Sequence, residues 1–183
     1  MSQTRRACFE RVIEAVGEPL RQYAARRTDA ETAQDVVADA FLVIWRRLDD
    51  VPVGAELPWC YAVARNCLAN AERSARRQRG LLTRIARMDP PPQVEAAVPD
   101  APDPALHRAL AQLPADDREL LRLWAWEDLA PAEIAVVLHT TSNAVSIRLH
   151  RAKKRLADVL AETSTRKPPP TSGHKQVQGR SSP

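Results

Sequence analysis

Residues 59–77 carry a row of side chains with the chemistry to bind unpaired nucleic acid. A helix turns about 100° per residue, so one side of this stretch presents Trp59, Asn66, Asn70, Arg73 and Arg77. Aromatic rings stack on unpaired bases, amides read base edges, and guanidinium groups hold phosphates. The wider stretch 65–87 holds seven arginines and one acidic residue, a charge excess that attracts polyanions. A solvated basic helix without a ligand is the alternative interpretation.

Residues 131–160 have the pattern of a helix-turn-helix. Residues 131–138 (PAEIAVVL) predict a short apolar helix, and residues 139–141 (HTT) predict the turn, where Thr141 can cap the next helix. That next helix runs from Ser142 to about Leu160, and its buried side consists of Val145, Leu149, Ala152 and Leu156. The same pattern also occurs in helical proteins that do not bind DNA.

The other side of this second helix has the residue types that read duplex DNA. It carries Asn143, Ser146, Ile147, Arg148, His150, Arg151 and Lys154. No acidic residue occurs between positions 142 and 155. The N-terminal part of such a helix enters the major groove, so we expect Asn143 to pair with adenine and Ile147 to contact a thymine methyl. Arg151 and Lys154 would hold phosphates.

A third surface lies on the helix that is predicted to follow Thr28. Its buried stripe is Ala33, Val37, Ala40, Phe41, Ile44 and Leu48. The opposite face carries Asp35, Asp39, Leu42 and Arg46. Two acids beside an exposed leucine indicate a protein-binding strip. An ordinary solvated face is the alternative.

The elements that position these surfaces are all predicted to be helices. Only 4% of the residues are aromatic and glycines number five, whereas small aliphatic residues with arginine and glutamate suit helix bundles. The first helix has the buried set Phe9, Val12, Ile13, Val16, Leu20 and Tyr23. Thr28 and Glu31 resemble a capping box that opens the second helix. The third helix, from about Trp59 to Arg77, packs through Leu57, Cys60, Ala64, Leu68, Ala71 and Ala75.

Composition divides the chain into two small helical domains. Residues 89–105 (DPPPQVEAAVPDAPDPA) hold six prolines, four acidic residues and no basic ones, which predicts an extended, flexible linker. Residues 163–183 predict a disordered tail, because they cannot bury enough apolar surface to order themselves. We therefore expect a front block at 5–88 and a rear block at 106–162, each large enough for a helical domain.

Several classes of function are excluded or disfavoured. The sequence has no P-loop, HExxH or GxSxG motif, and its four histidines lack metal-ligand spacing. Cys8, Cys60 and Cys67 form no CxxC pair and predict neither a zinc site nor a disulfide framework. No apolar run approaches the roughly 20 residues that cross a bilayer. We expect a cytoplasmic protein that is not an enzyme, with no cofactor and no bound metal.

Over residues 9–160 the chain resembles the extracytoplasmic-function sigma factors. The stretch 33–41 (AQDVVADAF), followed by Trp45, is similar to the family's region 2.2, and 59–66 (WCYAVARN) is similar to its W-L-x-x-I-A-R-N pattern. Residues 109–114 (ALAQLP) resemble the start of region 4, and 133–135 (EIA) with 145–152 (VSIRLHRA) resemble its later motifs. The chain departs from the family pattern at Ala38, Asn70, His139 and Ala144. His139 replaces a glycine that commonly adopts a positive φ in the turn.

This resemblance implies a bacterial transcription initiation factor with two domains. The strip of residues 35–46 would bind core RNA polymerase, the 59–77 row would open the −10 element, and the helix after 142 would read the −35 element. Promoter DNA and an anti-sigma factor are the other implied partners. Two alternatives remain open from the residues alone. One is a stand-alone helix-turn-helix regulator that binds duplex DNA without polymerase, and the other is a helical adaptor without nucleic acid.

Overall fold

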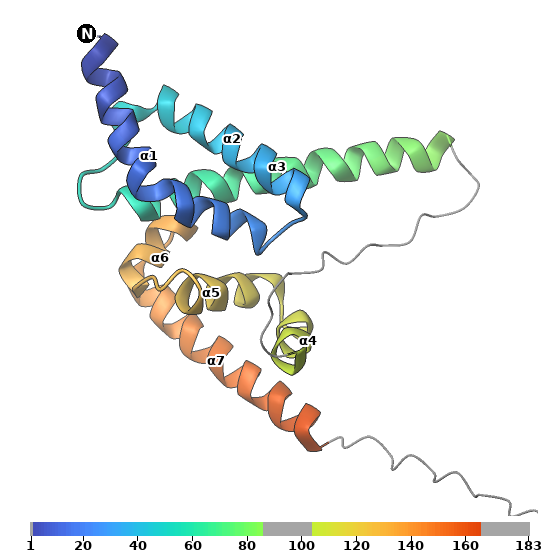
Figure 1. Cartoon of the computed structure of the whole chain (residues 1–183). Helices are drawn as coiled ribbons and strands as arrows, with labels where there is room; N and C mark the ends of the chain where they lie inside the picture. The colour runs from blue at the N-terminus through green and yellow to red at the C-terminus, as the bar shows by residue number, and fades with distance from the viewer. Residues whose placement is uncertain (1, 86–103, 166–183) are drawn as a thin grey trace, which may run out of the picture.

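The computed structural model of the chain describes residues 2–85 and 104–165, and these are helical with no strand (Figure 1). The front block contains α1 (Ser2–Ala25), α2 (Ala30–Arg46), the short 3-10 helix η1 (Leu48–Asp50) and α3 (Glu56–Ile85). The rear block contains α4 (Pro104–Gln112), α5 (Ala115–Ala125), α6 (Pro131–Leu138) and α7 (Ser142–Thr165). The predicted all-α fold is confirmed.

The ends of the two blocks differ by a few residues from the sequence boundaries. Residues 86–103 and 166–183, which include most of the predicted linker and tail, lie outside the described residues. The last two residues of the predicted linker already belong to α4, which starts at Pro104. Proline suits the first position of a helix because its missing N–H has no partner there in any case. At the other end, α7 continues to Thr165.

The front block is a three-helix bundle in which α1, α2 and α3 all pack against one another. Its core follows the predicted helical stripes. The fully or nearly fully buried members include Val12, Val16, Leu20 and Tyr23 of α1, Ala33, Val36, Val37, Ala40 and Ile44 of α2, and Cys60, Ala64 and Leu68 of α3. Phe9, Ile13 and Phe41 are half-buried against this core.

The N-terminus of α2 corrects the predicted capping box of Thr28 and Glu31. The N-cap is Asp29, whose carboxylate accepts hydrogen bonds from the backbone N–H of Thr32 at 2.9 Å and from its hydroxyl at 2.8 Å. The helix therefore starts one residue later than predicted. Thr28 does not cap the helix and instead donates its hydroxyl hydrogen to Asp29. The Asp29 carboxylate takes the capping position because it is the stronger acceptor for the unpaired amides of the first turn.

In the rear block, α7 packs against α4, α5 and α6. Val145, Leu149 and Ala152 form its buried side, and Leu156 is half-buried, as the periodicity predicts. They meet a core that includes Leu120, Leu123, Ile134 and Val137, all fully buried. This packing leaves the opposite side of α7 free for solvent.

The front and rear blocks also pack against each other, through α3 and α6 (Figure 1). Beside the predicted packing face, α3 buries a second side made of Tyr61, Ala62 and Val63. Helical periodicity did not predict this side, because it was used to assign one buried face and does not show that a second face is also covered. The Tyr61 ring lies 5.2 Å from that of Tyr23. Burial and the nearby Glu127 raise the pKa of the Tyr61 hydroxyl.

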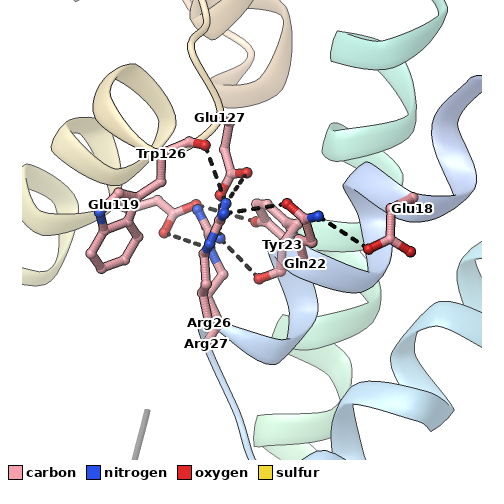
Figure 2. A network of polar contacts seen from close by, with 8 residues as sticks. All are labelled: Glu18, Gln22, Tyr23, Arg26, Arg27, Glu119, Trp126 and Glu127. Carbon is pink, nitrogen blue, oxygen red and sulfur yellow. Dashed lines mark hydrogen bonds and ion pairs between the residues drawn. The ribbon is translucent and has the colours of Figure 1, made fainter. Parts of the chain in front are cut away.

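A cluster of buried charges joins the two blocks beside this packing (Figure 2). Arg27, at the end of α1, donates from Nε to Glu119 of α5 at 3.1 Å and from Nη1 to Glu127 at 2.8 Å. Arg26 donates to the other oxygen of Glu127 at 3.0 Å and to the carbonyl of Trp126 at 3.1 Å. The side chains of Arg27 and Glu127 are each only 2% exposed.

Tyr23 completes this cluster. Its hydroxyl donates to Glu119 at 3.2 Å, and the Arg27 guanidinium lies 3.5 Å from the centre of its ring. Burial, with the neighbouring Glu119 charge, raises the pKa of the Tyr23 hydroxyl well above its ordinary value, so the group stays protonated and remains a donor. Every arginine and carboxylate of the cluster thus has a partner from the opposite block.

Candidate nucleic-acid interface

The helix-turn-helix has the local geometry that its sequence predicts. His139 ends α6 in the left-handed region, with φ 51° and ψ 51°. The amide of Thr140 then donates back to the carbonyl of Ala135 at 3.0 Å, which closes the turn. Thr141 caps α7, because its hydroxyl accepts from the N–H of Ala144 at 3.2 Å. At the start of α6, Glu133 accepts from the N–H of Ala130 at 2.8 Å.

The predicted duplex-reading residues share one solvent-facing side of α7. Asn143, Ser146, Ile147, His150, Arg151 and Lys154 are exposed, and Arg148 is half-exposed. Ile147 keeps 46% of its surface exposed, so an apolar group stands among the polar residues of this side. Ser146 donates its hydroxyl hydrogen to the carbonyl of Ser142 at 3.0 Å. That leaves the serine oxygen available as an acceptor toward a base.

Contacts between α5 and α7 hold this helix in place, and sequence reasoning did not identify them. The Lys153 ammonium lies 3.3 Å from the centre of the Trp124 ring. Arg155 forms a close ion pair with the buried Asp117, and Arg148 lies 3.7 Å from Asp116. Helical periodicity places these basic residues beside the reading face. Only the packing of α5 shows that Arg148 and Arg155 face acids of their own chain and that Lys153 faces a tryptophan ring.

The predicted row on α3 is mostly exposed. Asn66, Asn70, Arg73 and Arg77 all face solvent. Arg73 donates to Oδ1 of Asn70 at 2.6 Å and to the carbonyl of Ala69 at 3.1 Å.

Trp59 is set differently from its neighbours in this row. It is half-buried against the front core, and the guanidinium of Arg47 lies 5.4 Å from the centre of its ring. The turn before it contains Gly54 at φ 80°, a conformation that favours glycine. A base stacking on Trp59 would have to share or displace the Arg47 contact.

The predicted protein-binding strip lies on the exposed side of α2. Asp35, Asp39, Leu42 and Arg46 are all exposed, and Leu42 keeps 52% of its surface accessible. Trp45, three residues after Leu42 and 38% exposed, extends the apolar part of the strip. Its ring is held by an edge-on contact with Phe9 at 5.1 Å and by Arg5 at 5.6 Å. These contacts fix the place of the ring at the edge of the strip, and tryptophan is among the residues that contribute most to binding at interfaces.

The cysteines show no arrangement for metal binding. Cys60 and Cys67 are buried, and burial raises the pKa of the Cys60 thiol to about 12. Within the described ranges no group of three or more His, Cys, Asp or Glu side chains is placed to hold a metal ion. Nor does any helix in those ranges have both the length and the apolar character needed to cross a membrane.

Comparison with known proteins shows which family the chain belongs to. Residues 104–156 match the model of "Sigma-70, region 4". The chain is 32% identical over 151 residues to the "ECF RNA polymerase sigma factor SigL" of Mycobacterium tuberculosis, covering 78% of this chain and 83% of that protein. It is 30% identical over 135 residues to the "RNA polymerase sigma factor CarQ" of Myxococcus xanthus, covering 71% of this chain and 75% of that protein.

Solved structures share the fold. The sigma factor RpoE from Bartonella quintana, in complex with the anti-sigma factor NepR, aligns with a TM-score of 0.62 and 21% identity, over 84% of this chain and 96% of that one. CnrH, in complex with the cytosolic domain of CnrY, aligns with a TM-score of 0.57 and 26% identity, over 84% of this chain and 88% of that one. These relatives support the function of a polymerase-associated initiation factor and not that of a stand-alone regulator. The chain belongs to the extracytoplasmic-function RNA polymerase sigma factors.

Proposed function

We propose that this sigma factor binds core RNA polymerase through α2, opens the −10 element through α3 and reads the −35 element through α7. The observation that carries this proposal is the side of α7 that contains Asn143 and Ile147. It is exposed, free of acids and directly follows a helix-turn-helix turn. In this proposal residues 5–88 and 106–162 are the functional domains, and neither has a catalytic role.

The polymerase-binding role of α2 rests on its exposed apolar centre. Leu42 and Trp45 lie side by side on the helix, with Asp39 and Arg46 next to them. An apolar centre with a charged rim is the usual composition of a protein–protein interface. Trp45 and Leu42 would supply most of the binding free energy, and the charges would set orientation and association rate.

The −10 role of α3 rests on chemistry suited to unpaired strand. Asn66 and Asn70 offer amide groups to base edges, while Arg73 and Arg77 follow along the same side toward the C-terminus of the helix. Trp59 would stack on a base that has left the duplex. We propose that Arg47 moves from the ring to a phosphate in that step, so one cation–π contact is exchanged for an ion pair.

The −35 role of α7 rests on the division of its exposed side. Asn143, Ser146 and Ile147 lie in the first turns, where a recognition helix approaches base edges. His150, Arg151 and Lys154 follow and would hold phosphates. Because Arg148 lies 3.7 Å from Asp116, its phosphate contact would compete with that carboxylate. We therefore propose a smaller contribution from Arg148 than from Arg151.

We also propose an anti-sigma factor as a regulatory partner. The two solved relatives described above were each captured with a protein partner, NepR for the Bartonella factor and CnrY for CnrH. The exposed Leu42 and Trp45 give the front block an apolar surface that suits such a partner. A partner bound there would exclude polymerase by competition for the same strip.

Run-off transcription with purified core polymerase tests the proposed function as a whole. The template is the region upstream of the protein's own gene, and the expected result is a discrete transcript that requires both the protein and core polymerase. Binding of the protein to this DNA without polymerase, together with no transcript, would contradict the proposal.

The polymerase strip has its own test. Leu42→Glu should weaken binding to core polymerase by about tenfold or more, because it places a charge at the apolar centre of the strip. Val53→Glu is the matched control, since Val53 is 99% exposed and lies outside the strip. Equal affinities of the two variants, measured without DNA, would show that α2 does not contact polymerase.

A further inference from the structure

The contact between the two blocks is built differently from the core of either block. Beside the packing of α3 on α6, Arg26 and Arg27 on one side meet Glu119 and Glu127 on the other (Figure 2). These four side chains form three ion pairs of 2.8–3.1 Å. The residues that pair stand 92 to 101 positions apart in the sequence. No helix of either block depends on these pairs for its own hydrogen bonds.

Buried ion pairs give this contact high specificity and a small net stability. The attraction between the charges is largely offset by the loss of their hydration, so such pairs contribute little compared with apolar packing of the same volume. The balance here is also imperfect, because Nη2 of Arg27 is buried and has no hydrogen-bond partner among the described residues. Burial and the nearby Arg27 charge lower the pKa of Arg122 in the same region. A contact of this type can separate without unfolding either block.

Promoter binding requires such a separation. The positions that name the −10 and −35 elements differ by about 25 base pairs, which is about 85 Å along straight duplex at about 3.4 Å per base pair. A single compact body of about 140 residues has a radius of gyration of only about 15 Å. In the closed arrangement α6 packs on α3, and the residues that would read the −35 element lie in the first turns of α7, directly after α6. Both elements cannot be reached at once from there.

We propose that Arg26, Arg27, Glu119 and Glu127 form an intramolecular latch that holds the free sigma factor closed and must open before both promoter elements are engaged. The positive charges of the latch lie on the front block and the negative charges on the rear block. The need for opening rests on the proposed function, whereas the latch itself does not. If the latch keeps most molecules closed, the apparent affinity of the factor for promoter is reduced by the fraction that is open.

Small-angle X-ray scattering of the full chain, without DNA or polymerase, tests the latch directly. The variant Glu119→Gln with Glu127→Gln removes both rear charges and keeps the side-chain shapes. Its radius of gyration should be roughly a quarter larger than that of the unsubstituted chain. The reason is that residues 89–105, whose composition predicts an extended linker, would let the two blocks move apart. The matched control is Glu10→Gln with Glu18→Gln, which removes two exposed carboxylates that pair within α1. The control should scatter like the unsubstituted chain.

Far-UV circular dichroism of the same samples separates opening from unfolding. An open but folded variant keeps its helical signal. If the double glutamine variant loses helix, Arg26→Gln decides the question, because the Arg26 side chain is 32% exposed and its loss leaves the Arg27 pairs in place. It should expand the chain in the same direction by a smaller amount. An unchanged radius of gyration in a folded variant overturns the latch and leaves the proposed function untouched.

Promoter binding by the holoenzyme tests the consequence of the latch. With core polymerase present, the double glutamine variant should bind promoter between about twofold and tenfold more tightly, the upper value corresponding to an open fraction of about one tenth. An expanded variant with unchanged promoter affinity would overturn the claim that closure limits engagement. Absence of promoter binding by every variant, control included, would instead contradict the proposed function.

Discussion

Arg27 and Glu127 are separated by 100 residues of sequence, yet Nη1 of the arginine lies 2.8 Å from Oε1 of the glutamate, and both side chains are 2% exposed. The pair lies where the end of α1 meets the loop after α5. Because the two residues belong to different blocks, the pair reports on the association of the two blocks.

Replacement of Arg27 should uncouple the two blocks. Arg27→Met would leave Glu119 and Glu127 buried without a counter-charge in the closed form, at a cost of about 3–5 kcal/mol relative to the paired state. Urea unfolding should then show a lower m-value or two transitions in place of one, because the blocks unfold separately. Arg6→Met, which breaks an exposed pair inside α1, should leave the transition unchanged. A single transition with the original m-value in Arg27→Met would contradict the coupling.

Two substitutions on α7 should differ in kind. Asn143→Ala removes an amide at the base-reading end of the helix and should change preference at one position of the −35 element, by about 1–3 kcal/mol. Arg151→Ala removes a phosphate contact and should weaken binding to all sequences alike, with a shallower salt dependence. Competition binding to a library of −35 variants, with core polymerase present, measures both effects. Identical specificity profiles would show that α7 is oriented differently on the DNA.

The turn of the helix-turn-helix should gain stability from glycine at position 139. His139 has φ 51°, and a left-handed conformation costs a residue with a Cβ about 1 kcal/mol relative to glycine. His139→Gly should therefore raise the free energy of unfolding of the rear block by up to about 1 kcal/mol. Thr140→Gly should lower it, since Thr140 has no positive φ to relieve. Thermal denaturation of both variants gives the signs.

Asp29 should make the stability of the front block depend on acid pH. Hydrogen bonds from Thr32 hold the pKa of the Asp29 carboxyl below its ordinary value. A lowered folded-state pKa means that the stabilisation is present above the unfolded-state pKa, about 4, and disappears as the pH falls through the folded-state value. Asp29→Ala should cost about 1 kcal/mol near neutral pH and progressively less in acid. Asp29→Asn, which caps without a titrating group, should remove this pH dependence.

The thiol of Cys60 should be unreactive in the folded protein. Burial raises its pKa to about 12, so almost no thiolate is present near pH 8, and the thiolate is the reactive form. Iodoacetamide should label the half-exposed Cys8 before Cys60, with Cys60 labelled only after addition of denaturant. Mass spectrometry of the alkylated peptides identifies the order. Rapid labelling of Cys60 in the native protein would indicate local opening of the front core.

Sequence patterns predicted most of the helices and their buried sides, because both depend on short-range periodicity. The stripe from Val12 to Tyr23 and the side of α7 around Val145 are buried as expected. The positive φ of His139 and the Thr141 cap also follow from local rules of turn geometry. The start of α2 was predicted one residue early, because Thr28 and Asp29 are both good capping residues and their competition is decided by geometry.

The amino-acid sequence by itself therefore determined the helical fold, the turn before α7 and the residue types of each candidate surface, since these are set by neighbours within a few positions. Only the tertiary structure decided that Tyr61 and Val63 are buried on a second side of α3, that Arg47 covers Trp59, and that Arg26 and Arg27 meet Glu119 and Glu127. These contacts join residues far apart in the chain, and no periodicity within one helix specifies which distant helix will cover it.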